Sequence, residues 1–485
     1  MARGLMFMGT GSDVGKSLIV AGLCRYFTQQ GLRVRPFKPQ NMSNNAAVTP
    51  EGGEIGRAQA LQARACQVPP HVHMNPVLLK PQSEIGSQVI VQGKIYGTAK
   101  AVDYQAMKRD LMPAVLDSFH QLQTEADLIL IEGAGSGAEI NLRTDDIANW
   151  GFACASQTPV VLVGDIDRGG VIASVVGTHS LIGDEERNLL KGFLINKFRG
   201  DPALFTAGSS LITQKTEMLN FGTVPYFPAA NKLPAEDALA LNHPQRVQEG
   251  LKIVVLQTPR ISNFDDLDPL VQEPGAYVQF LSAGNPIPGD ADLVILAGSK
   301  ATIADLEFVR DQGWDIDLRA HMRRGGRILG LCGGYQMLGT HIHDPQGVEG
   351  RAGTAMGLGL LEVQTWLRPH KSLRQVKGTH VRSGHPIQGY EMHIGTTTGP
   401  DCARAYLDFA GHGEGAQSPN GQIQGTYVHG LFAADGFRRA FVHDLGGQAS
   451  DFAYETQVEQ TLDDLATHLA DNLDMEAILA AASPY

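Results

Sequence analysis

Short apolar runs alternate with amphipathic stretches through the first half of the chain. Residues 4–8, 127–131, 159–163 and 192–195 are the clearest of these runs. Strands that are buried on both faces of a sheet read as continuous apolar runs, and helical stretches between them are typical of parallel pairing. The pattern therefore predicts a parallel α/β domain.

A second series of apolar runs follows a segment of different composition. Residues 228–250 are rich in Ala, Pro, Asn and charged side chains, which indicates a linker, and strand-like runs resume at residues 252–256, 292–296 and 326–330. Near the end of the chain, residues 456–482 place Leu and Ala at helical spacing. The predicted organisation is a first α/β domain (residues 1–235), a linker (236–250), a second α/β domain (251–445) and a C-terminal helical tail (446–485).

Composition favours a small-molecule enzyme of a reducing compartment. The chain has 485 residues, enough for two or more cores, and its formal net charge of −12 comes without a Lys/Arg-rich stretch. The sequence has no apolar run of the length that crosses a bilayer, so neither nucleic acid nor membrane is expected as a partner. The five cysteines are scattered without a C-x-x-C pair, which argues against disulfides and structural zinc. The apolar N-terminus runs directly into a glycine-rich loop, so we expect a buried strand rather than a signal peptide, and a cytoplasmic location.

The glycine-rich segment, residues 9–17 (GTGSDVGKS), joins the first predicted strand to an apolar helix. Backbone N–H groups and the helix N-terminus are expected to meet phosphates, Lys16 to neutralise them, and the Ser17 hydroxyl to bind Mg²⁺. The common phosphate-loop pattern has Gly where Thr10 stands, and a glycine-rich turn that binds nothing is the alternative. The expected nucleotide contacts are Gly9, Thr10, Gly11, Asp13, Val14, Gly15, Lys16 and Ser17.

Acidic residues follow two of the predicted strands. Glu132 comes at the end of the run 128–131, where a carboxylate at the carboxyl edge of a sheet can hold Mg²⁺; a plain turn glutamate is the alternative. Asp165 and Asp167 follow the run 159–163, and both metal or substrate binding and helix capping stay open for them.

A cysteine stands in a tight glycine turn at residues 330–334 (GLCGG), where a predicted strand meets a predicted helix. This pattern is typical of a nucleophile elbow, in which the glycines permit a strained turn that projects the central side chain. Cys332 is therefore the expected nucleophile, because a helix N-terminus and a nearby histidine favour the reactive thiolate. A buried structural cysteine is the alternative. The backbone N–H groups of Gly298 and Gly333 are expected to form an oxyanion hole.

A histidine ends another apolar strand about a hundred residues downstream of the elbow. His429 is expected to take the thiol proton and later to protonate the leaving ammonia. His385 and His393 are the strongest rivals among the other histidines.

Each half of the chain resembles a known family. The loop spacing GT-x-x-x-VGK[ST] resembles that of dethiobiotin synthetase, which implies that Lys38 is a second phosphate or carboxylate contact and that Asn196 contacts the nucleotide base. A surface lysine before a turn is the alternative for Lys38. The order of cysteine and histidine resembles that of class I glutamine amidotransferases with a flavodoxin-like fold. Many of these enzymes place a glutamate two residues after the histidine to orient its ring, and this chain has Leu431 there. The third residue of a catalytic triad is therefore missing or supplied elsewhere.

Over essentially its whole length the chain resembles the cobyric acid synthases, which are glutamine-dependent amidases of cobalamin biosynthesis. The motifs that carry the resemblance are residues 38–45 (KPQNMSNN), 74–81 (MNPVLLKP), 141–143 (NLR), 164–174 and 389–393 (GYEMH), together with the elbow. The resemblance implies amidation of the b, d, e and g carboxylates of adenosylcobyrinic acid a,c-diamide, with ATP, Mg²⁺ and glutamine and without a redox cofactor or tightly bound metal. Asn41, Asn44 and Asn45 are expected to bind the corrinoid, since an uncharged amide suits both carboxylate and amide neighbours.

Two other functions stay open at the level of sequence. One is the cobyrinic acid a,c-diamide synthase, which performs the same chemistry on different carboxylates. The other is a regulatory ATPase of the MinD type with an inactive glutaminase-like domain, although the loop lacks the second lysine that such ATPases often carry. The sequence does not decide between a monomer and a homo-oligomer.

Overall fold

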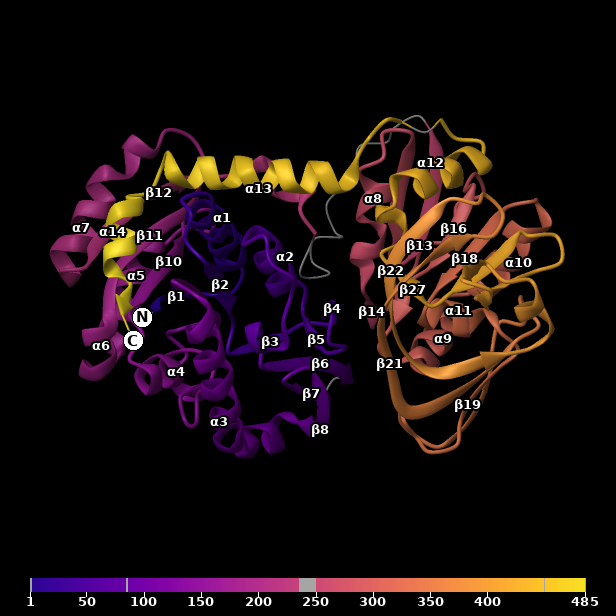
Figure 1. Ribbon diagram of the computed structural model, residues 1–485, viewed down its shortest axis with the longest axis horizontal. Helices are drawn as coiled ribbons and strands as arrows, with labels where there is room; N and C mark the ends of the chain where they lie inside the picture. The colour runs from indigo at the N-terminus through magenta and orange to yellow at the C-terminus, as the bar shows by residue number, and fades with distance from the viewer. Residues whose placement is uncertain (1, 84–85, 235–249, 449, 485) are drawn as a thin grey trace.

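The chain folds into two sheet-based bodies that lie side by side along the long axis of the molecule (Figure 1). A computed structural model describes residues 2–83, 86–234, 250–448 and 450–484. We call residues 2–234 the first half and residues 250–448 the second half. Of the predicted linker, 236–250, Gly250 alone lies within the described residues.

The first half is built on a sheet with the strand order β12-β11-β10-β1-β9-β2, in which all these neighbours pair in parallel. Its strands are β1 (Arg3–Gly9), β2 (Val34–Phe37), β9 (Leu128–Ser136), β10 (Val160–Asp165), β11 (Leu190–Phe198) and β12 (Leu219–Pro225). The predicted parallel α/β fold is confirmed, because the continuous apolar runs form the central strands, buried on both faces.

Helices cover both faces of this sheet. They are α1 (Lys16–Gln29), α2 (Arg57–Ala65), α3 (Ala101–Glu125), α4 (Trp150–Ser156), α5 (Val171–Leu181), α6 (Asp184–Leu189) and α7 (Thr206–Thr216). Met6 and Met8 of β1 pack in one apolar core with α3, α4 and α5, whereas Leu5 and Phe7 pack in another with α1. The alternation along β1 thus places the phosphate-loop helix and α3 on opposite faces.

A smaller group of strands extends the first half toward the second. These strands are β3 (Gln40–Met42), β4 (Ala46–Val48), β5 (Glu54–Gly56), β6 (Val77–Ser83), β7 (Gly86–Val91) and β8 (Lys94–Lys100). Ala46, Val48, Leu78 and Ile90 from this group form an apolar cluster with Met392 of the second half. The two halves therefore share a buried interface.

The second half contains a parallel sheet with the order β15-β13-β16-β18-β26, to which β25 adds an antiparallel edge. Its strands are β13 (Leu251–Leu256), β15 (Ala276–Leu281), β16 (Leu293–Leu296), β18 (Arg327–Leu331), β25 (Ala416–Gln417) and β26 (Ile423–Thr426). The helices of this half are α8 (Asp268–Val271), α9 (Thr302–Asp311), α10 (Trp314–Arg323), α11 (Gly333–Leu338) and α12 (Asp435–Asp444).

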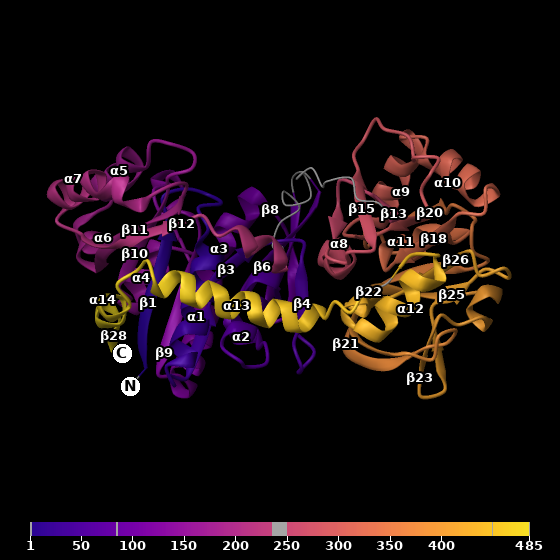
Figure 2. The same ribbon diagram turned by 90° about the horizontal axis from the view of Figure 1, so that it is seen from above.

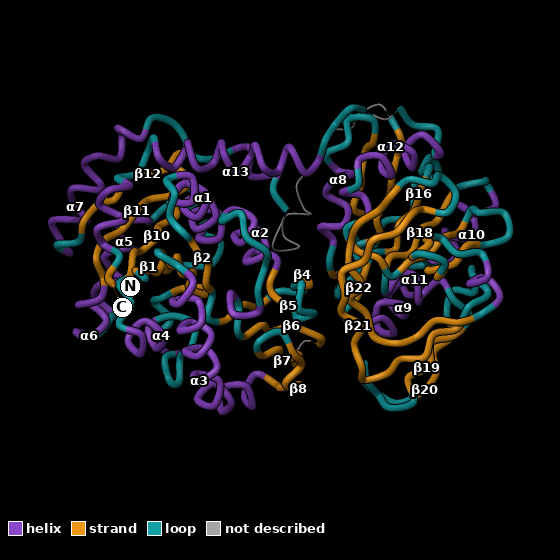
Figure 3. Tube along the Cα trace, viewed as in Figure 1, coloured by secondary structure: helices purple, strands orange, loops and turns teal. Residues whose placement is uncertain are grey.

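A further, mostly antiparallel sheet faces the first half (Figure 3). Its strands are β19 (His341–Asp344), β20 (Gly353–Met356), β21 (Gln364–His380), β22 (Pro386–Thr398), β23 (Leu407–Phe409), β24 (His412–Glu414) and β27 (Val428–His429). A short antiparallel pair, β14 (Ile261–Ser262) with β17 (Gly298–Ser299), lies nearby in the second half. The sequence pattern did not predict this layer.

The C-terminal segment returns to the first half. Helix α13 (Tyr454–Ala470) runs from the second half along α1, and it is followed by α14 (Met475–Ala481) and by β28 (Ser483–Pro484), which pairs with β1 (Figure 2). A Cβ atom on Gly22 of α1 would lie 2.5 Å from Cδ1 of Leu469, so the two helices are in close contact. The predicted helical tail is therefore part of the core of the first half.

Candidate active site

The glycine-rich loop connects β1 to α1, and α1 begins at Lys16. Gly15 has a φ of 93°, and a Cβ atom there would lie 2.3 Å from Nδ2 of Asn196. A side chain at this position is thus excluded by conformation and by space. Lys16 Nζ donates to the carbonyl of Gly135 at 2.8 Å, so the loop is closed over the end of β9.

A buried carboxylate lies at the centre of this first site. Glu132 Oε1 accepts hydrogen bonds from Ser17 Oγ at 2.7 Å and from Lys38 Nζ at 2.8 Å. Gln62 Nε2 donates to Glu132 Oε2 at 2.6 Å, and Gln59 Nε2 approaches the same oxygen at 3.4 Å. The structure brings the three predicted residues together and adds two glutamines of α2 that the sequence did not single out.

Asn196 lies at the edge of the loop, together with Asp165 and Asp167, for which the sequence leaves both ligand binding and helix capping open. Asn196 Nδ2 donates to the carbonyl of Val14 at 2.8 Å. Asp165 pairs with Lys197 at 2.9 Å and accepts from the backbone N–H of Asp167, whose own side chain pairs with Arg199. Both aspartates therefore have basic partners within this half.

The predicted corrinoid contacts lie on β3 and in the turn between β3 and β4. Asn41 is buried, and its Nδ2 donates to Gln59 Oε1 at 2.9 Å, which connects it to Glu132. Asn45 is also buried, and its carbonyl accepts from the backbone N–H of Arg57. Asn44 is partly exposed. The structure thus places Asn41 beside the first site and Asn45 at the start of α2.

The elbow of the second half is strained at its cysteine. Cys332 lies between β18 and α11 with φ 51° and ψ −107°, a conformation that a residue with a side chain rarely adopts. A Cβ atom on Gly334 would lie 1.9 Å from the carbonyl oxygen of Leu296, so the turn requires glycine there. The thiol of Cys332 lies 3.5 Å from the carbonyl of Met392, which accepts from it.

The Cys332 thiol is close enough to His429 to shift the pKa of the imidazole, and the Asp266 carboxylate holds ring nitrogen Nδ1. His429 Nδ1 lies 2.6 Å from Oδ2 of Asp266, while Oδ1 of the same carboxylate accepts from the backbone N–H of Gly430 at 2.8 Å. Burial acts to lower the pKa of His429, but the Asp266 carboxylate and the Cys332 thiol raise it to about 10. The arrangement has the geometry of a Cys-His-Asp triad.

Asp266 was missed by the sequence reasoning because it precedes the histidine by 163 residues. It lies on a short 3₁₀ helix, η6 (Phe264–Leu267), far from the position after the histidine where the resemblance directed attention. Leu431 occupies that position and is fully buried in the apolar core. The sequence offers no spacing rule that points to Asp266.

The rival histidines have other surroundings. The His393 ring stacks on Tyr427 with centroids 3.7 Å apart and faces the Glu391 carboxylate at 3.9 Å. His385 is exposed. Of these three histidines, His429 is the one that has both the Asp266 carboxylate as a hydrogen-bond partner and a pKa raised by the Cys332 thiol.

The two predicted oxyanion-hole glycines flank the triad. A Cβ atom on Gly298 would lie 3.6 Å from Cε1 of His429 and 2.8 Å from the carbonyl of Ser262. A Cβ atom on Gly333 would lie 2.8 Å from the backbone nitrogen of Ser299. The glycine at position 298 thus allows the backbone to approach the His429 ring, and the glycine at position 333 allows the elbow to approach the backbone at Ser299.

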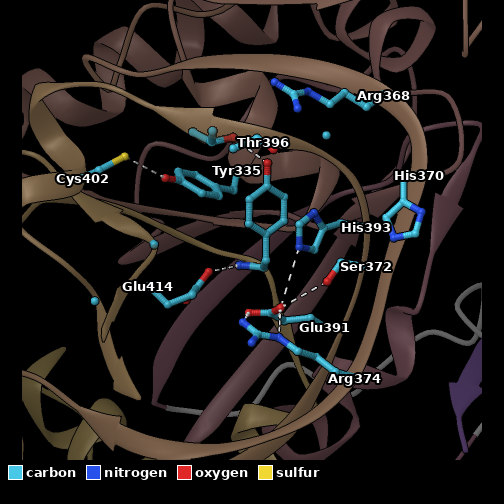
Figure 4. A pocket seen from close by; sticks show the side chains of 15 residues that line it. Tyr335, Arg368, His370, Ser372, Arg374, Glu391, His393, Thr396, Cys402 and Glu414 are labelled. Carbon is cyan, nitrogen blue, oxygen red and sulfur yellow. Dashed lines mark hydrogen bonds and ion pairs between the residues drawn. The ribbon is translucent and has the colours of Figure 1, made fainter. Parts of the chain in front are cut away.

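A polar pocket of about 490 Å³ lies along strand β22, whose Met392 carbonyl accepts from the thiol (Figure 4). Glu391 forms a bidentate pair with Arg374, at 2.6 and 3.0 Å, and also contacts Ser372. The pKa of Glu391 falls to about 2, because Arg374 and His393 outweigh the effect of its burial. The pocket therefore offers charged groups of both signs next to the elbow.

Membrane spans and clusters of metal ligands were sought in residues 2–83, 86–234, 250–448 and 450–484. Within these ranges, no helix has the length and apolarity needed to span a membrane. The same ranges contain no group of three or more His, Cys, Asp or Glu side chains that could hold a metal ion.

Comparison with known families agrees with this division into two sites. Residues 5–240 match the CobQ/CobB/MinD/ParA nucleotide binding domain, and residues 252–437 match the CobB/CobQ-like glutamine amidotransferase domain. A nucleotide-binding half joined to a glutamine amidotransferase half defines a glutamine-dependent amidating enzyme.

Full-length relatives specify the family. The chain is 59% identical to a cobyric acid synthase of Methylorubrum populi over 100% of both chains. It is 60% identical to one of Bradyrhizobium sp. (99% of this chain, 98% of the relative) and 58% identical to one of Cereibacter sphaeroides (99% of each). The chain belongs to the cobyric acid synthase family.

Proposed function

We propose that the chain amidates the b, d, e and g carboxylates of adenosylcobyrinic acid a,c-diamide, using ATP and taking ammonia from glutamine. The observation that carries this proposal is the presence, in one chain of this family, of a thiol–imidazole–carboxylate triad and a phosphate loop closed on Glu132. The a,c-diamide synthase alternative is less well supported, because the full-length relatives are cobyric acid synthases.

In the second half, Cys332 attacks the carboxamide carbon of glutamine while His429 takes the thiol proton. The backbone N–H groups at Gly298 and Gly333 stabilise the oxyanion, and His429 returns the proton to the leaving ammonia. Asp266 holds the ring in the orientation that this exchange needs and stabilises its protonated form. Water then hydrolyses the glutamyl thioester and releases glutamate.

In the first half, the loop and the N-terminus of α1 bind the phosphates of ATP, and Lys16 and Lys38 neutralise their charge. The corrinoid carboxylate attacks the γ-phosphorus to give an acyl phosphate and ADP. Ammonia then attacks the acyl carbon, and phosphate leaves as the amide forms. Asn41, Asn44 and Asn45 are the side chains that we expect to position the corrinoid, and Asn196 the one that contacts the base.

The donor set in the first half fits Mg²⁺. The Ser17 hydroxyl and the Glu132 carboxylate lie 2.7 Å apart, and hard oxygen ligands of this kind suit that ion. Ser17 and Glu132 would hold it beside the loop, where it would neutralise charge on the transferred phosphate. Lys38 shares Oε1 of Glu132 with Ser17, so this lysine and the metal site are connected.

Ammonia has to pass from one half to the other without meeting bulk water, because protonation abolishes its nucleophilicity. The apolar cluster around Met392 seals part of the interface. Beside it, Glu54 pairs with Lys80 of its own half at 2.6 Å and with Lys371 of the other half, and the three side chains are buried. These contacts support a closed interface rather than two independent enzymes.

The division of labour is tested by replacing the nucleophile. Cys332→Ala is expected to lose corrinoid amidation with glutamine but to keep it with ammonium salts at the same ATP concentration. Both activities are measured by chromatography of the corrinoid products. Loss of both activities in a folded variant would contradict the proposal.

A further inference from the structure

Helix α2 lies between the two sites and contacts both. Its first residue, Arg57, reaches the second half, whereas Gln59 and Gln62, further along the same helix, contact Glu132 in the first site. Arg57 belongs to none of the motifs that mark the phosphate loop or the elbow. Its place in the fold nevertheless connects them.

Arg57 makes two short contacts across the interface. One Nη2 atom lies 2.6 Å from Oδ2 of Asp265 and 2.6 Å from the hydroxyl of Tyr390. The side chains of Arg57 and Asp265 are 15% and 9% exposed, so this ion pair is largely desolvated. A charge-assisted contact in such surroundings is stronger than a surface ion pair and costly to break from one side.

Both partners of Arg57 support the glutaminase histidine. Asp265 precedes Asp266, which binds Nδ1 of His429. The Tyr390 ring stacks on the His429 ring with centroids 5.2 Å apart and planes 20° apart, and the two residues are direct neighbours in the β22–β27 pairing. Arg57 thus touches the carboxylate segment on one side of the imidazole and the aromatic ring on the other.

We propose that Arg57 is a positioning residue for the glutaminase reaction, which fixes Asp265 and Tyr390 so that Asp266 and His429 hold their reactive geometry. The glutaminase site is therefore complete only when α2 of the first half is docked on it. This inference rests on the assignment of Cys332, His429 and Asp266 under the proposed function.

Electrostatics give Arg57 a second role in the same place. Asp265 and Asp266 are adjacent carboxylates whose side chains are 9% and 2% exposed, and Nδ1 of His429 pairs with Asp266. Burial raises the pKa of Asp265 to about 6, and the Arg57 guanidinium opposes this shift. Without Arg57 the pKa of Asp265 would rise further, so this carboxyl would take up a proton and lose the ion pair that fixes it beside Asp266.

Helix α2 also supplies Gln59 and Gln62, which contact Glu132 in the first site. Gln62 lies on the helix that begins at Arg57, and its Nε2 donates to Glu132 at 2.6 Å. A shift of α2 on nucleotide binding would therefore move Arg57 together with Gln62. We therefore expect glutamine hydrolysis to respond to Mg·ATP and corrinoid through Arg57. This response is a property of the full chain.

The test compares Arg57→Gln, Arg57→Lys and a control on the same helix, Arg64→Gln. Arg64 pairs with Glu455 and Glu459 of α13, about half-exposed partners in a surface network of small expected worth. Glutamate release is measured with and without Mg·ATP and corrinoid, amidation is measured with ammonium salts, and thermal unfolding reports folding.

For Arg57→Gln we expect kcat of glutamine hydrolysis to fall by about tenfold or more, while KM for glutamine changes by less than about threefold. Stimulation by Mg·ATP and corrinoid is lost, ammonium-dependent amidation stays within about threefold, and Arg57→Lys regains part of the loss. Arg64→Gln behaves as the wild type. An unchanged kcat and stimulation in Arg57→Gln would overturn the inference, as would an equal fall of glutamine- and ammonium-dependent activities.

Failure of this inference is distinguishable from failure of the proposed function. Glutamate release needs no corrinoid turnover, so a wild type that hydrolyses glutamine but amidates no corrinoid refutes the substrate assignment alone. A loss of hydrolysis in Arg57→Gln would still support the positioning role.

Discussion

Replacing Asp266 by asparagine should disable the glutaminase reaction while leaving the rest of the enzyme intact. Asn has the size of Asp but lacks its charge, so Asp266→Asn removes the partner of the imidazolium with little change in packing. The pKa of His429 is raised from 6.5 to about 10 by Asp266 and Cys332 against the effect of burial. That rise corresponds to roughly 5 kcal/mol of preference for the protonated ring. If Asp266 supplies about half of it, kcat of glutamine hydrolysis falls by about a hundredfold.

The assay is glutamate release at saturating glutamine, with ammonium-dependent amidation measured in parallel. The latter should stay within about twofold of the wild type, because the first half is untouched. Asp290→Asn is a suitable control, since Asp290 forms an exposed ion pair with Lys252 in the same half. A kcat for Asp266→Asn within about threefold of the wild type would refute the reasoning and require another group to orient His429.

Three further changes test other parts of the structure. Lys38→Met should abolish amidation with either nitrogen donor, because it removes the cation beside Glu132, but it should spare the glutamate release measured without ATP and corrinoid; loss of this basal release as well would contradict the separation of the sites. Gly298→Ala should lower glutamine-dependent activity and spare ammonium-dependent activity, because the added methyl group would lie 2.8 Å from the Ser262 carbonyl and 3.6 Å from the His429 ring. Unchanged glutamine-dependent activity would argue against an oxyanion hole at this glycine. Burial raises the pKa of Glu414 from 4.5 to about 7 in the folded protein, so its contribution to stability is fully present below pH 4.5 and is lost as the pH rises through 7. Urea unfolding at pH 5 and at pH 8 gives the fall in unfolding free energy between the two pH values. This fall should be smaller for Glu414→Gln than for the wild type, by up to about 3 kcal/mol, and equal falls would contradict the reasoning.

The parallel sheets could be predicted from the sequence because their strands are buried on both faces and read as apolar runs. Strand β21 could not, since its sequence, QTWLRPHKSLRQVKGTH, is polar and contains a proline. Its conformation depends on pairing with β22, which the local sequence does not encode. Helix α13 was expected as a helix from its spacing, but its contact with α1 depends on residues more than 400 positions apart, such as Arg25 and Asp463.

The same distinction separates the parts of the candidate sites. The loop around Lys16 and the elbow around Cys332 are local motifs, in which a turn needs glycine at set positions, so sequence alone singles them out. Asp266 and Arg57 have no such local constraint, because each acts through a partner from another part of the fold. Glu132 was selected from its place at a strand end and Lys38 from the family resemblance, while the glutamines around them became apparent from the structure.

The most direct test of the account is mass spectrometry of adenosylcobyrinic acid a,c-diamide after incubation with the protein, Mg·ATP and glutamine. The account predicts successive hydroxyl-to-amide mass steps, one for each of the b, d, e and g carboxylates, ending at the cobyric acid product. An unchanged corrinoid, with cobyrinic acid itself amidated instead, would contradict the substrate assignment, and ATP hydrolysis without amidation of either compound would contradict the proposed chemistry.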